Sequence, residues 1–297
     1  MVMGKKIEAN EVLNSPVFIV GSPRSGTTWL QKLFLEHPNV IGGQESEFFF
    51  NFGCLFSAIK EPDPTISRPV GMNIYWHSRK EEFEELIRHI WRETFKPLLL
   101  QKEYPTLLLE KTPIHALQID RIKSIFPTAK FIHIIRDSRS TCASLISAAN
   151  GWGKHWAPSS PKDAAVLWWR SVHYGRKLGL ALNSDYIEVH YEDLLRNSAY
   201  ELGRLYNFCS LSYSEEQLKN IIKKQSISTQ KNSLGEGLKD VSGKTLKEPA
   251  GFFGKAQKDS WRKDLNLYQK LIIWKYTRKL MRECGYDWNG RIYKNGY

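Results

Sequence analysis

One short segment, residues 21–29, constrains the fold of this chain more than any other. It reads Gly-Ser-Pro-Arg-Ser-Gly-Thr-Thr-Trp, follows the apolar run 17–20 and leads into a helical stretch over 29–35. A strand, a glycine-bounded loop and a helix in that order aim backbone N–H groups and the positive end of a helix dipole at one point. The sequence therefore predicts a binding site for a multiply charged anion at this loop.

The loop differs from nucleoside triphosphate loops at a position that changes its chemistry. An ATP or GTP loop carries Lys and then Ser or Thr after its second glycine, whereas Gly26 is followed by Thr27 and Thr28. The cation comes earlier instead, at Arg24, whose guanidinium can bind phosphate or sulfate oxygens through two parallel hydrogen bonds. We therefore expect an anionic group donor other than a nucleoside triphosphate. A glycine turn that serves only close packing would not explain the adjoining hydroxyls and Arg24.

Length and composition favour one globular domain over residues 1–297, with residues 1–14 as a polar N-terminal extension. Of the 297 residues, 41% are hydrophobic, which is enough for a large core. No apolar run is long enough to span a membrane, and the polar start lacks the apolar segment of a secretory signal. Four widely spaced cysteines form no metal-type pair, so we expect no metal site and reduced thiols in a cytoplasmic protein.

The net charge of +12 does not by itself identify a partner. Basic chains often bind nucleic acid, but the lysines are scattered and no zinc-finger, homeodomain or RNA-recognition pattern occurs. We therefore expect no nucleic-acid partner. A small anionic ligand accounts for part of the excess charge, and solvated surface charge accounts for the rest.

Continuous apolar strands alternate with helical segments along the chain. This alternation is typical of an α/β fold with a P-loop-type central parallel sheet flanked by helices, and the last third is expected to be helical apart from a polar loop over 235–254. The expected strands cover residues 17–20, 106–110, 130–135 and 186–189, with a further short element over 41–47. The expected helices cover residues 29–35, 81–95, 138–149 and 162–182, with another ending at 125.

Ligands of open α/β sheets collect beyond the carboxyl ends of the strands. The residues that follow the expected strands are 21–29, 110–113, 136–137 and 190–193. Three of these four segments carry a cation or the anion-binding loop. This is the pattern expected around a nucleotide-like polyanion.

With these segments aligned, the chain resembles sulfotransferases that use 3′-phosphoadenosine 5′-phosphosulfate (PAPS) and release adenosine 3′,5′-bisphosphate (PAP). The loop resembles the family's 5′-phosphosulfate loop, which implies donor contacts from Arg24, Ser25, Gly26, Thr27, Thr28 and Trp29. Arg136 and Ser144, eight positions apart after a strand, resemble the family's 3′-phosphate motif. The resemblance extends over residues 15–285.

Two further segments resemble the family more weakly. Tyr191 begins a Tyr-Glu-Asp-Leu segment whose tyrosine, by the resemblance, contacts the adenine side of the donor. Residues 252–256, followed by Trp261, resemble the family's closing loop, although Gly254 replaces its usual arginine and Ala256 its usual glycine. By this resemblance Lys255 and Lys258 are candidate ligands of the 3′-phosphate.

The catalytic base is expected to differ from that of phenol and steroid sulfotransferases. Those enzymes carry Lys-Thr-His after the second strand, but here Lys111 and Thr112 are followed by Pro113. His115 lies two residues further on, where a surface position is expected. Residues 37–49 instead resemble the segment that supplies a glutamate base in heparan sulfate and tyrosylprotein sulfotransferases; in its motifs as a whole the chain is most similar to these two groups and to bacterial sulfotransferases. This similarity implies Glu45 as the base, with Glu47 and His115 as alternatives.

The residues beside the base have expected roles as well. By the same resemblance Lys111 lies near the reaction centre, where an ammonium can stabilise charge on the transferred group. Arg24 is the third expected catalytic residue. Glu110 is expected only to form an ion pair with Lys111 at the end of its strand.

Together these patterns predict O-sulfotransfer from PAPS by in-line displacement, without a metal ion. The expected acceptor is a hydroxyl of a sugar, a glycolipid or a small molecule; peptide tyrosine fits a reducing compartment less well. Two other functions stay open from the residues alone. One is a P-loop phosphotransferase or NTPase, and the other is a non-catalytic module that binds polyanions.

Overall fold

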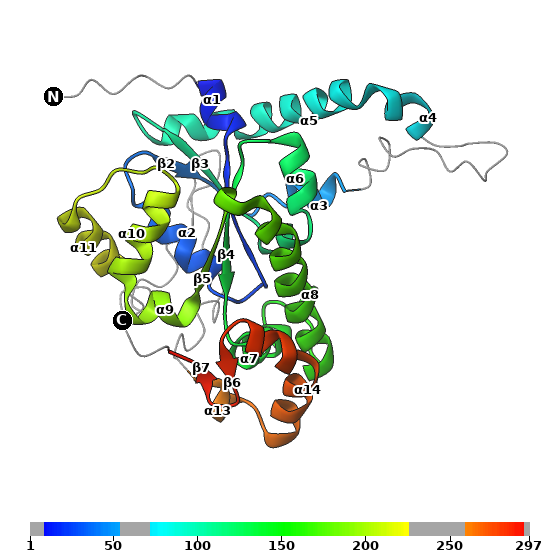
Figure 1. Ribbon diagram of the computed structural model, residues 1–297, viewed down its shortest axis with the longest axis vertical. Helices are drawn as coiled ribbons and strands as arrows, with labels where there is room; N and C mark the ends of the chain where they lie inside the picture. Colours follow the sequence, from blue (N-terminus) through cyan, green and yellow to red (C-terminus); the bar gives the residue numbers. More distant parts are fainter. Residues whose placement is uncertain (1–8, 54–71, 226–258, 294–297) are drawn as a thin grey trace.

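A parallel sheet forms the centre of the molecule, as the alternating pattern predicts. The computed structural model describes residues 9–53, 72–225 and 259–293. Within them, five parallel strands lie in the order β2-β3-β1-β4-β5. Their bounds are β1 Val17–Gly21, β2 Val40–Gly42, β3 Leu107–Lys111, β4 Lys130–Ile135 and β5 Tyr186–His190. The predicted α/β class with a P-loop-type parallel sheet and a helical C-terminal part is confirmed (Figure 1).

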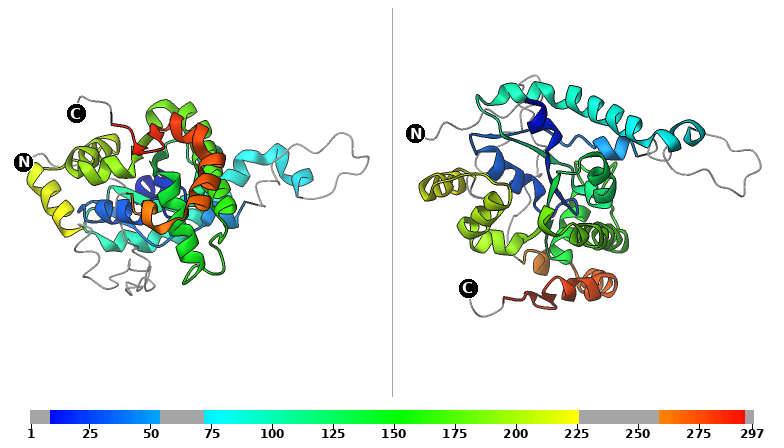
Figure 2. Two further views of the ribbon diagram at one scale, coloured as in Figure 1. Left: turned by 90° about the horizontal axis from the view of Figure 1, so that it is seen from below. Right: turned by 45° about the horizontal axis from the view of Figure 1, so that its top comes forward.

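Helices cover both faces of this sheet. On one face lie α1 (Ala9–Asn14), α3 (Phe48–Asn51), α5 (Lys80–Phe95), α6 (Ile119–Ile125) and the end of α8 (Pro161–Gly179). On the other lie α2 (Thr27–Leu35), α9 (Tyr191–Arg196), α10 (Ser198–Phe208) and α11 (Glu215–Lys224). Figure 2 shows α10 and α11 across the sheet from α8.

The central strand β1 shows why the strands read as continuous apolar runs. Val17 and Ile19 join the core on the α2 side, whereas Phe18 and Val20 join the core on the α5 side. Successive side chains of a strand point to opposite faces, so a strand covered on both faces needs apolar residues throughout. The expected short element over 41–47 is only partly a strand, because β2 ends at Gly42 and a loop follows.

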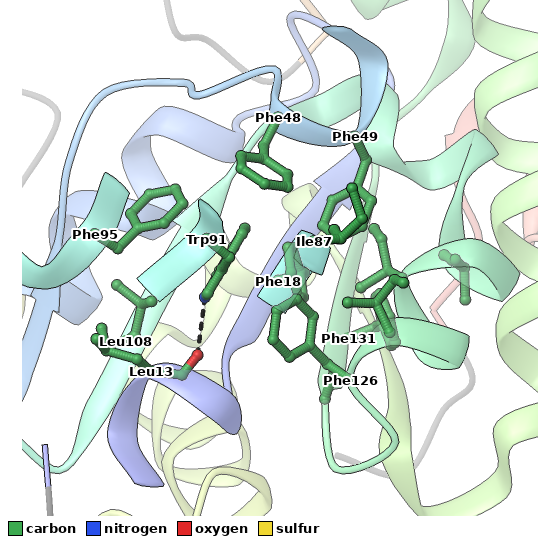
Figure 3. Packing of buried hydrophobic residues seen from close by; sticks show 14 of the residues in the cluster. Leu13, Phe18, Phe48, Phe49, Ile87, Trp91, Phe95, Leu108, Phe126 and Phe131 are labelled. Atoms are coloured by element: carbon green, nitrogen blue, oxygen red, sulfur yellow. Dashed lines mark hydrogen bonds between the residues drawn. The ribbon is translucent and has the colours of Figure 1, made fainter. Parts of the chain in front are cut away.

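Residues 9–14, the second part of the expected N-terminal extension, pack against the rest of the fold. They form α1, and Val12 and Leu13 are buried at 2% and 1% exposure. The indole Nε1 of Trp91 on α5 donates a hydrogen bond of 2.8 Å to the carbonyl oxygen of Leu13 (Figure 3). The polar composition of the first fourteen residues hid these two apolar contacts.

The C-terminal part packs beside the end of the sheet toward which the strands point. Helix α14 (Leu267–Glu283) packs against α7 (Ser138–Ala149) and α8 through residues such as Ile273 and Met281. The short helices α4 (Asn73–Trp76) and α13 (Trp261–Asp264) complete the α-helices described. A hairpin that the sequence did not predict, β6 (Tyr286–Asp287) and β7 (Gly290–Arg291), follows α14.

Several expectations concern residues outside those that the structure describes. Lys255, Lys258 and the loop 235–254 belong to this group, and so does Cys54. The other three cysteines are free and buried, and the cytoplasmic location stays a prediction. Among the described residues, no helix is both long and apolar enough to cross a membrane.

The burial of α1 makes a testable prediction. Replacing Leu13 by alanine should lower the free energy of unfolding by about 2–4 kcal/mol, because it leaves a cavity beside Trp91. Urea unfolding followed by fluorescence measures this change. Leu100, which is 90% exposed, provides the matched control, and Leu100→Ala should change the free energy by less than about 0.5 kcal/mol. Equal effects of the two substitutions would contradict the packing of α1.

Candidate functional site

The strand order brings the predicted site segments to one edge of the sheet. The connection that follows β1 runs to β2 on one side of the sheet, and the connection that follows β4 runs to β5 on the other side. The two connections therefore diverge between the neighbouring strands β1 and β4, and open α/β sheets bind their ligands at such a point. The loop after β1, Lys111 at the end of β3, Arg136 after β4 and Tyr191 after β5 all lie at this carboxyl edge.

The loop between β1 and α2 is tightly turned and partly buried. Ser22 and Ser25 are almost fully buried, and the Ser25 hydroxyl donates a 2.7 Å hydrogen bond to the Ser22 carbonyl oxygen. Gly26 has φ +105°, and a Cβ added there would lie 2.5 Å from Cδ2 of Tyr191. The second glycine of the loop is therefore needed both for its backbone conformation and for contact with Tyr191. The first turn of α2, which begins at Thr27, has N–H groups without intrahelical acceptors.

Two guanidinium groups and a hydroxyl meet beside this loop. Arg24 adopts a left-handed conformation with φ +71°, and its Nε donates a 3.1 Å hydrogen bond to Oγ of Ser144. Its guanidinium lies 5.2 Å from the ring centre of Trp152. Nη1 of Arg136 donates a 3.3 Å hydrogen bond to the Arg24 carbonyl oxygen. The structure thus brings together three predicted donor-binding residues that are up to 120 positions apart.

Arg136 reaches the segment after β5 on its other side. Its guanidinium carbon lies 4.2 Å from the ring centre of Tyr191, which is 4% exposed. Burial raises the pKa of the Tyr191 phenol, although the Arg136 charge acts in the opposite direction. Nε of Arg136 is buried and has no hydrogen-bond partner among the described residues. A buried donor without a partner is costly, so an anion at this position would stabilise the arrangement.

Trp29 completes the predicted donor side of the site. Its ring meets that of Tyr191 edge-on, with 5.6 Å between the ring centres. Its indole Nε1 donates a 2.9 Å hydrogen bond to the carbonyl oxygen of Gln225, just beyond α11. Trp29 therefore packs beside the ring expected on the adenine side, rather than against the loop itself.

Lys111 joins the loop to the predicted base. Its side chain is 3% exposed, and its Nζ donates to Oε1 of Glu45, whose side chain is 41% exposed. The same nitrogen donates a 3.3 Å hydrogen bond to Oγ1 of Thr28. Strand β3 lies between β2 and β1, so its last residue can reach the loop after β2 and the helix after β1. One buried ammonium thereby contacts both sides of the candidate site.

Glu110 and His115 differ from what the sequence suggested. Glu110 does not pair with Lys111, because its carboxylate accepts hydrogen bonds from the Ser46 hydroxyl at 2.8 Å and the Thr112 hydroxyl at 2.6 Å. Nδ1 of His115 lies 3.0 Å from the same carboxylate. Burial raises the pKa of Glu110, but His115 and the two hydroxyls outweigh it, so the pKa is lowered overall. The sequence could not show that these residues meet around one carboxylate.

His115 is a buried structural residue rather than the surface residue that we expected. It is fully buried, and its Nε2 accepts a 3.3 Å hydrogen bond from the backbone N–H of Phe49 while Nδ1 faces Glu110. Both ring nitrogens are therefore occupied. Glu47, the other alternative base, has φ +48° and is the N-cap residue directly before α3. Its backbone N–H donates a 3.2 Å hydrogen bond to the Thr112 hydroxyl. Glu45, rather than Glu47, contacts Lys111.

A second layer of buried charges, not predicted from the sequence, supports Arg136. The Glu192 carboxylate accepts a 3.1 Å hydrogen bond from the Asp137 backbone N–H and a 2.6 Å hydrogen bond from the Tyr286 hydroxyl. Burial, reinforced by the nearby Asp137 carboxylate, raises the pKa of Glu192 to about 7. In the sequence, only its position directly after Tyr191 pointed to a place near the site. Tyr286, from the unpredicted hairpin, gave no such signal.

Arg139, on α7 with Ser144, connects this helix to the C-terminal part of the chain. It is fully buried and binds both oxygens of Asp137, with Nε–Oδ1 3.0 Å and Nη2–Oδ2 2.6 Å. It also donates to the carbonyl oxygens of Asp287 and Trp288, and its guanidinium lies 3.9 Å from the ring centre of Trp261. These contacts hold the start of α7, directly after Arg136, in one position.

Comparison with known proteins assigns the family. A model of the sulfotransferase family matches residues 16–215, about two thirds of the chain. The chain belongs to the sulfotransferase family. The matched residues include the loop after β1, Glu45, Lys111, Arg136, Ser144 and Tyr191.

Two curated relatives of this sulfotransferase have different names. Protein-tyrosine sulfotransferase 1 of Danio rerio is 25% identical over 215 residues, covering 68% of this chain and 55% of the relative. The omega-hydroxy-beta-dihydromenaquinone-9 sulfotransferase of Mycobacterium bovis is 25% identical over 261 residues, covering 71% of this chain and 66% of the relative. The chain therefore spans between about half and two thirds of these relatives' own length.

Solved structures share the fold of this sulfotransferase. A mouse sulfotransferase complexed with PAP matches 91% of this chain and 84% of its own, with a TM-score of 0.56 at 14% identity. The sulfotransferase domain from the curacin biosynthetic pathway matches 90% of this chain and 97% of its own, with a TM-score of 0.57 at 16% identity.

Among the described residues, no group of three or more His, Cys, Asp or Glu side chains could hold a metal ion.

The raised pKa of Glu192 makes stability depend on pH. The pKa of Glu192 is about 7 in the folded protein, and the ordinary pKa of a Glu side chain is 4.5. Between these two pH values the carboxyl group is ionised in the unfolded chain but stays protonated in the folded protein. The contribution of Glu192 is therefore fully present below pH 4.5 and falls by roughly 3 kcal/mol as the pH rises through 7. In Glu192→Gln this loss should vanish. Urea unfolding at pH 5 and pH 8 tests it, and parallel pH dependence in both proteins would refute it.

Proposed function

We propose that this sulfotransferase moves a sulfuryl group from PAPS to the hydroxyl of an acceptor, with Glu45 as the general base. The observation that carries the proposal is the position of Lys111. Its buried ammonium contacts Glu45 on one side and Thr28 of the anion-binding loop on the other. A base for an acceptor and a loop for an anionic donor are thus held within one hydrogen-bonded unit.

The residues on the donor side fit a nucleotide with two separate anionic groups. The start of α2, with Ser25, Gly26, Thr27 and Thr28, would hold the 5′ group. Arg136 and Ser144 would hold a 3′-phosphate, which would meet the unpartnered Nε of Arg136. The mouse structure of the same fold was solved with PAP, which supports this choice of donor. PAPS would supply the sulfuryl group, and the chain would supply alignment and charge.

Charge and proton movements then follow from the residues in place. Glu45 takes the proton of the acceptor hydroxyl, whose oxygen forms the new bond to sulfur. The bond from sulfur to the 5′-phosphate oxygen breaks, and that oxygen keeps the electron pair. Lys111 and the loop N–H groups stabilise the negative charge on the sulfuryl oxygens and the departing phosphate. Arg24 would help to stabilise the same negative charge once its guanidinium turns from Ser144 toward the loop.

The acceptor class remains a hydroxylated molecule. The names of the relatives include tyrosine in proteins and a menaquinone derivative, so the family accepts both polar and lipid hydroxyl compounds. For this chain we propose a hydroxyl of a sugar, a glycolipid or a small molecule. Trp152, against Arg24, and the partly exposed Trp156 beside it would form one wall for such an acceptor.

Donor choice is the direct test of this function. Isothermal titration calorimetry without metal should show PAP binding at least about 100-fold more tightly than ATP, because ATP lacks a 3′-phosphate for Arg136. Incubation with PAPS carrying labelled sulfate and a panel of hydroxylated acceptors should then yield a labelled product by mass spectrometry. Magnesium-dependent ATP turnover would instead indicate a phosphotransferase or NTPase. Binding of polyanions without any transfer would indicate a non-catalytic module.

Substitution of the base separates chemistry from binding. Glu45→Gln should lower kcat by about 100-fold or more, because no carboxylate then accepts the hydroxyl proton. Its affinity for PAP should stay within about twofold of wild type, because the change leaves the donor side intact. Glu47→Gln is the matched control and should keep most of the activity. Full turnover by Glu45→Gln would exclude Glu45 as the base.

Substitution of Arg136 tests the 3′-phosphate assignment. Arg136→Ala should weaken PAP binding by about 10- to 100-fold, because a charge-assisted hydrogen bond is lost. The KM for acceptor should change little. The preference for PAP over ATP should shrink at the same time. A variant that loses affinity for donor and acceptor equally would show that Arg136 has a general structural role.

A further inference from the structure

The outer face of α14 carries an unusual set of exposed side chains. Leu267, Tyr268 and Leu271 are 67%, 69% and 51% exposed. Four exposed cations follow on the same helix: Lys275, Arg278, Lys279 and Arg282. At 100° per residue, these seven side chains fall within an arc of about 120°. The apolar and cationic groups therefore share one outward stripe rather than two separate faces.

In the part of the chain that the structure describes, the four cations form none of the ion pairs that are common on a solvated helix face. None of them pairs with a carboxylate among the described residues, and Glu283 is the only acidic residue of α14. Helix α5 provides the comparison within the same molecule. There Lys80 pairs with Glu84 at 3.6 Å and Arg88 with Glu85 at 2.7 Å. The cations on α5 are thus paired with carboxylates, whereas within residues 9–53, 72–225 and 259–293 the four cations of α14 have no carboxylate partner.

The inner face of α14 fixes this stripe to the body of the protein. Ile273, Leu280 and Met281 are buried in the core shared with α7 and α8. The Thr277 hydroxyl lies 2.9 Å from the Ser138 hydroxyl at the start of α7. The stripe is therefore preformed, and a partner would bind it without any refolding of the helix.

Charge and composition together identify one kind of partner. A second copy of this chain would bring like charges against the four cations, which opposes self-association through this stripe. The exposed leucines and tyrosine would gain nothing from a purely ionic ligand. An interfacial helix on a membrane combines these features, since leucine and tyrosine enter the headgroup boundary while lysine and arginine bind lipid phosphates. We propose that the outer face of α14 docks this protein onto an anionic phospholipid surface.

The position of α14 gives this docking a consequence for the site. In Figures 1 and 2, α14 lies at the end of the molecule toward which the strands of the sheet point, and α5 lies at the opposite end. Docking through α14 would place the carboxyl edge of the sheet near the lipid surface rather than remote from it. The proposal concerns binding alone, and it does not depend on the proposed function.

Vesicle flotation with the full chain tests the proposal. Vesicles of phosphatidylcholine alone are compared with vesicles that also contain phosphatidylglycerol, at low and at physiological salt. The protein should bind the anionic vesicles at least about tenfold more tightly, and added salt should weaken that binding. Equal binding to both kinds of vesicle, or binding to neither, would overturn the proposal.

Matched variants locate the binding surface. Arg278→Gln with Lys279→Gln should weaken binding to anionic vesicles by about 25-fold, at about fivefold per cation. Leu271→Gln, which keeps the charge, should weaken it by about fivefold or more, whereas an ionic ligand such as an acidic peptide would not respond to this change. The control, Lys80→Gln on α5 with Lys96→Gln just beyond its end, removes the same charge at the other end of the molecule and should bind within about twofold of wild type. An α5 control that loses as much affinity as the α14 variant would refute docking through α14.

Discussion

The ammonium of Lys111 is the charge on which the arrangement of the candidate site depends. A nearly buried cation is stable only with polar partners around it, and the two partners of Lys111 come from different segments. Glu45 lies in the loop after β2, and Thr28 lies on the helix after β1. Only the strand between β2 and β1 can place one side chain within reach of both. The order of the sheet and the pairing of Lys111 are therefore two aspects of one constraint.

The other half of the sheet repeats this geometry with an arginine. Strand β4 lies between β1 and β5, and Arg136, directly after β4, touches the Arg24 carbonyl oxygen on one side and Tyr191 on the other. Each of the two strands flanking β1 thus has a cation at its carboxyl end, Lys111 as the last residue of β3 and Arg136 directly after β4. Between them lies the loop that offers backbone N–H groups. Arg139 extends this support to the C-terminal part, since it holds Asp287 and Trp288 against the start of α7.

Local signals allowed much of this to be predicted from the sequence. The strands β1, β3 and β4 are largely continuous apolar runs, and the loop after β1 combines two glycines with hydroxyl residues and Arg24. Helix α7 begins and ends where its pattern predicted, with Asp137 as its N-cap. Strand β2 was less clear because it has three residues, which is too short for a periodic pattern.

Long-range pairings could not be predicted in the same way. The partners of Glu110 lie as many as 64 residues away, at Ser46, so the sequence suggested a simple ion pair with the adjacent lysine. His115 has the polarity of a surface residue, but in the core its Nδ1 meets the Glu110 carboxylate and its Nε2 accepts a hydrogen bond from the Phe49 N–H. The hydrogen bond between Glu192 and Tyr286 could not be predicted either, because these residues are 94 positions apart. Residue type indicated chemistry in each case, but only the fold decided which partner it met.

A double-mutant cycle on Glu45 and Lys111 tests the central claim most directly. The rate of sulfate transfer from PAPS is measured for wild type, Glu45→Gln, Lys111→Met and the double variant. If the carboxylate and the ammonium act as one unit, the double variant should lose about as much activity as the more damaging single variant. Losses that simply multiply would show two independent residues, and would contradict the proposed bridge between the base Glu45 and the donor loop.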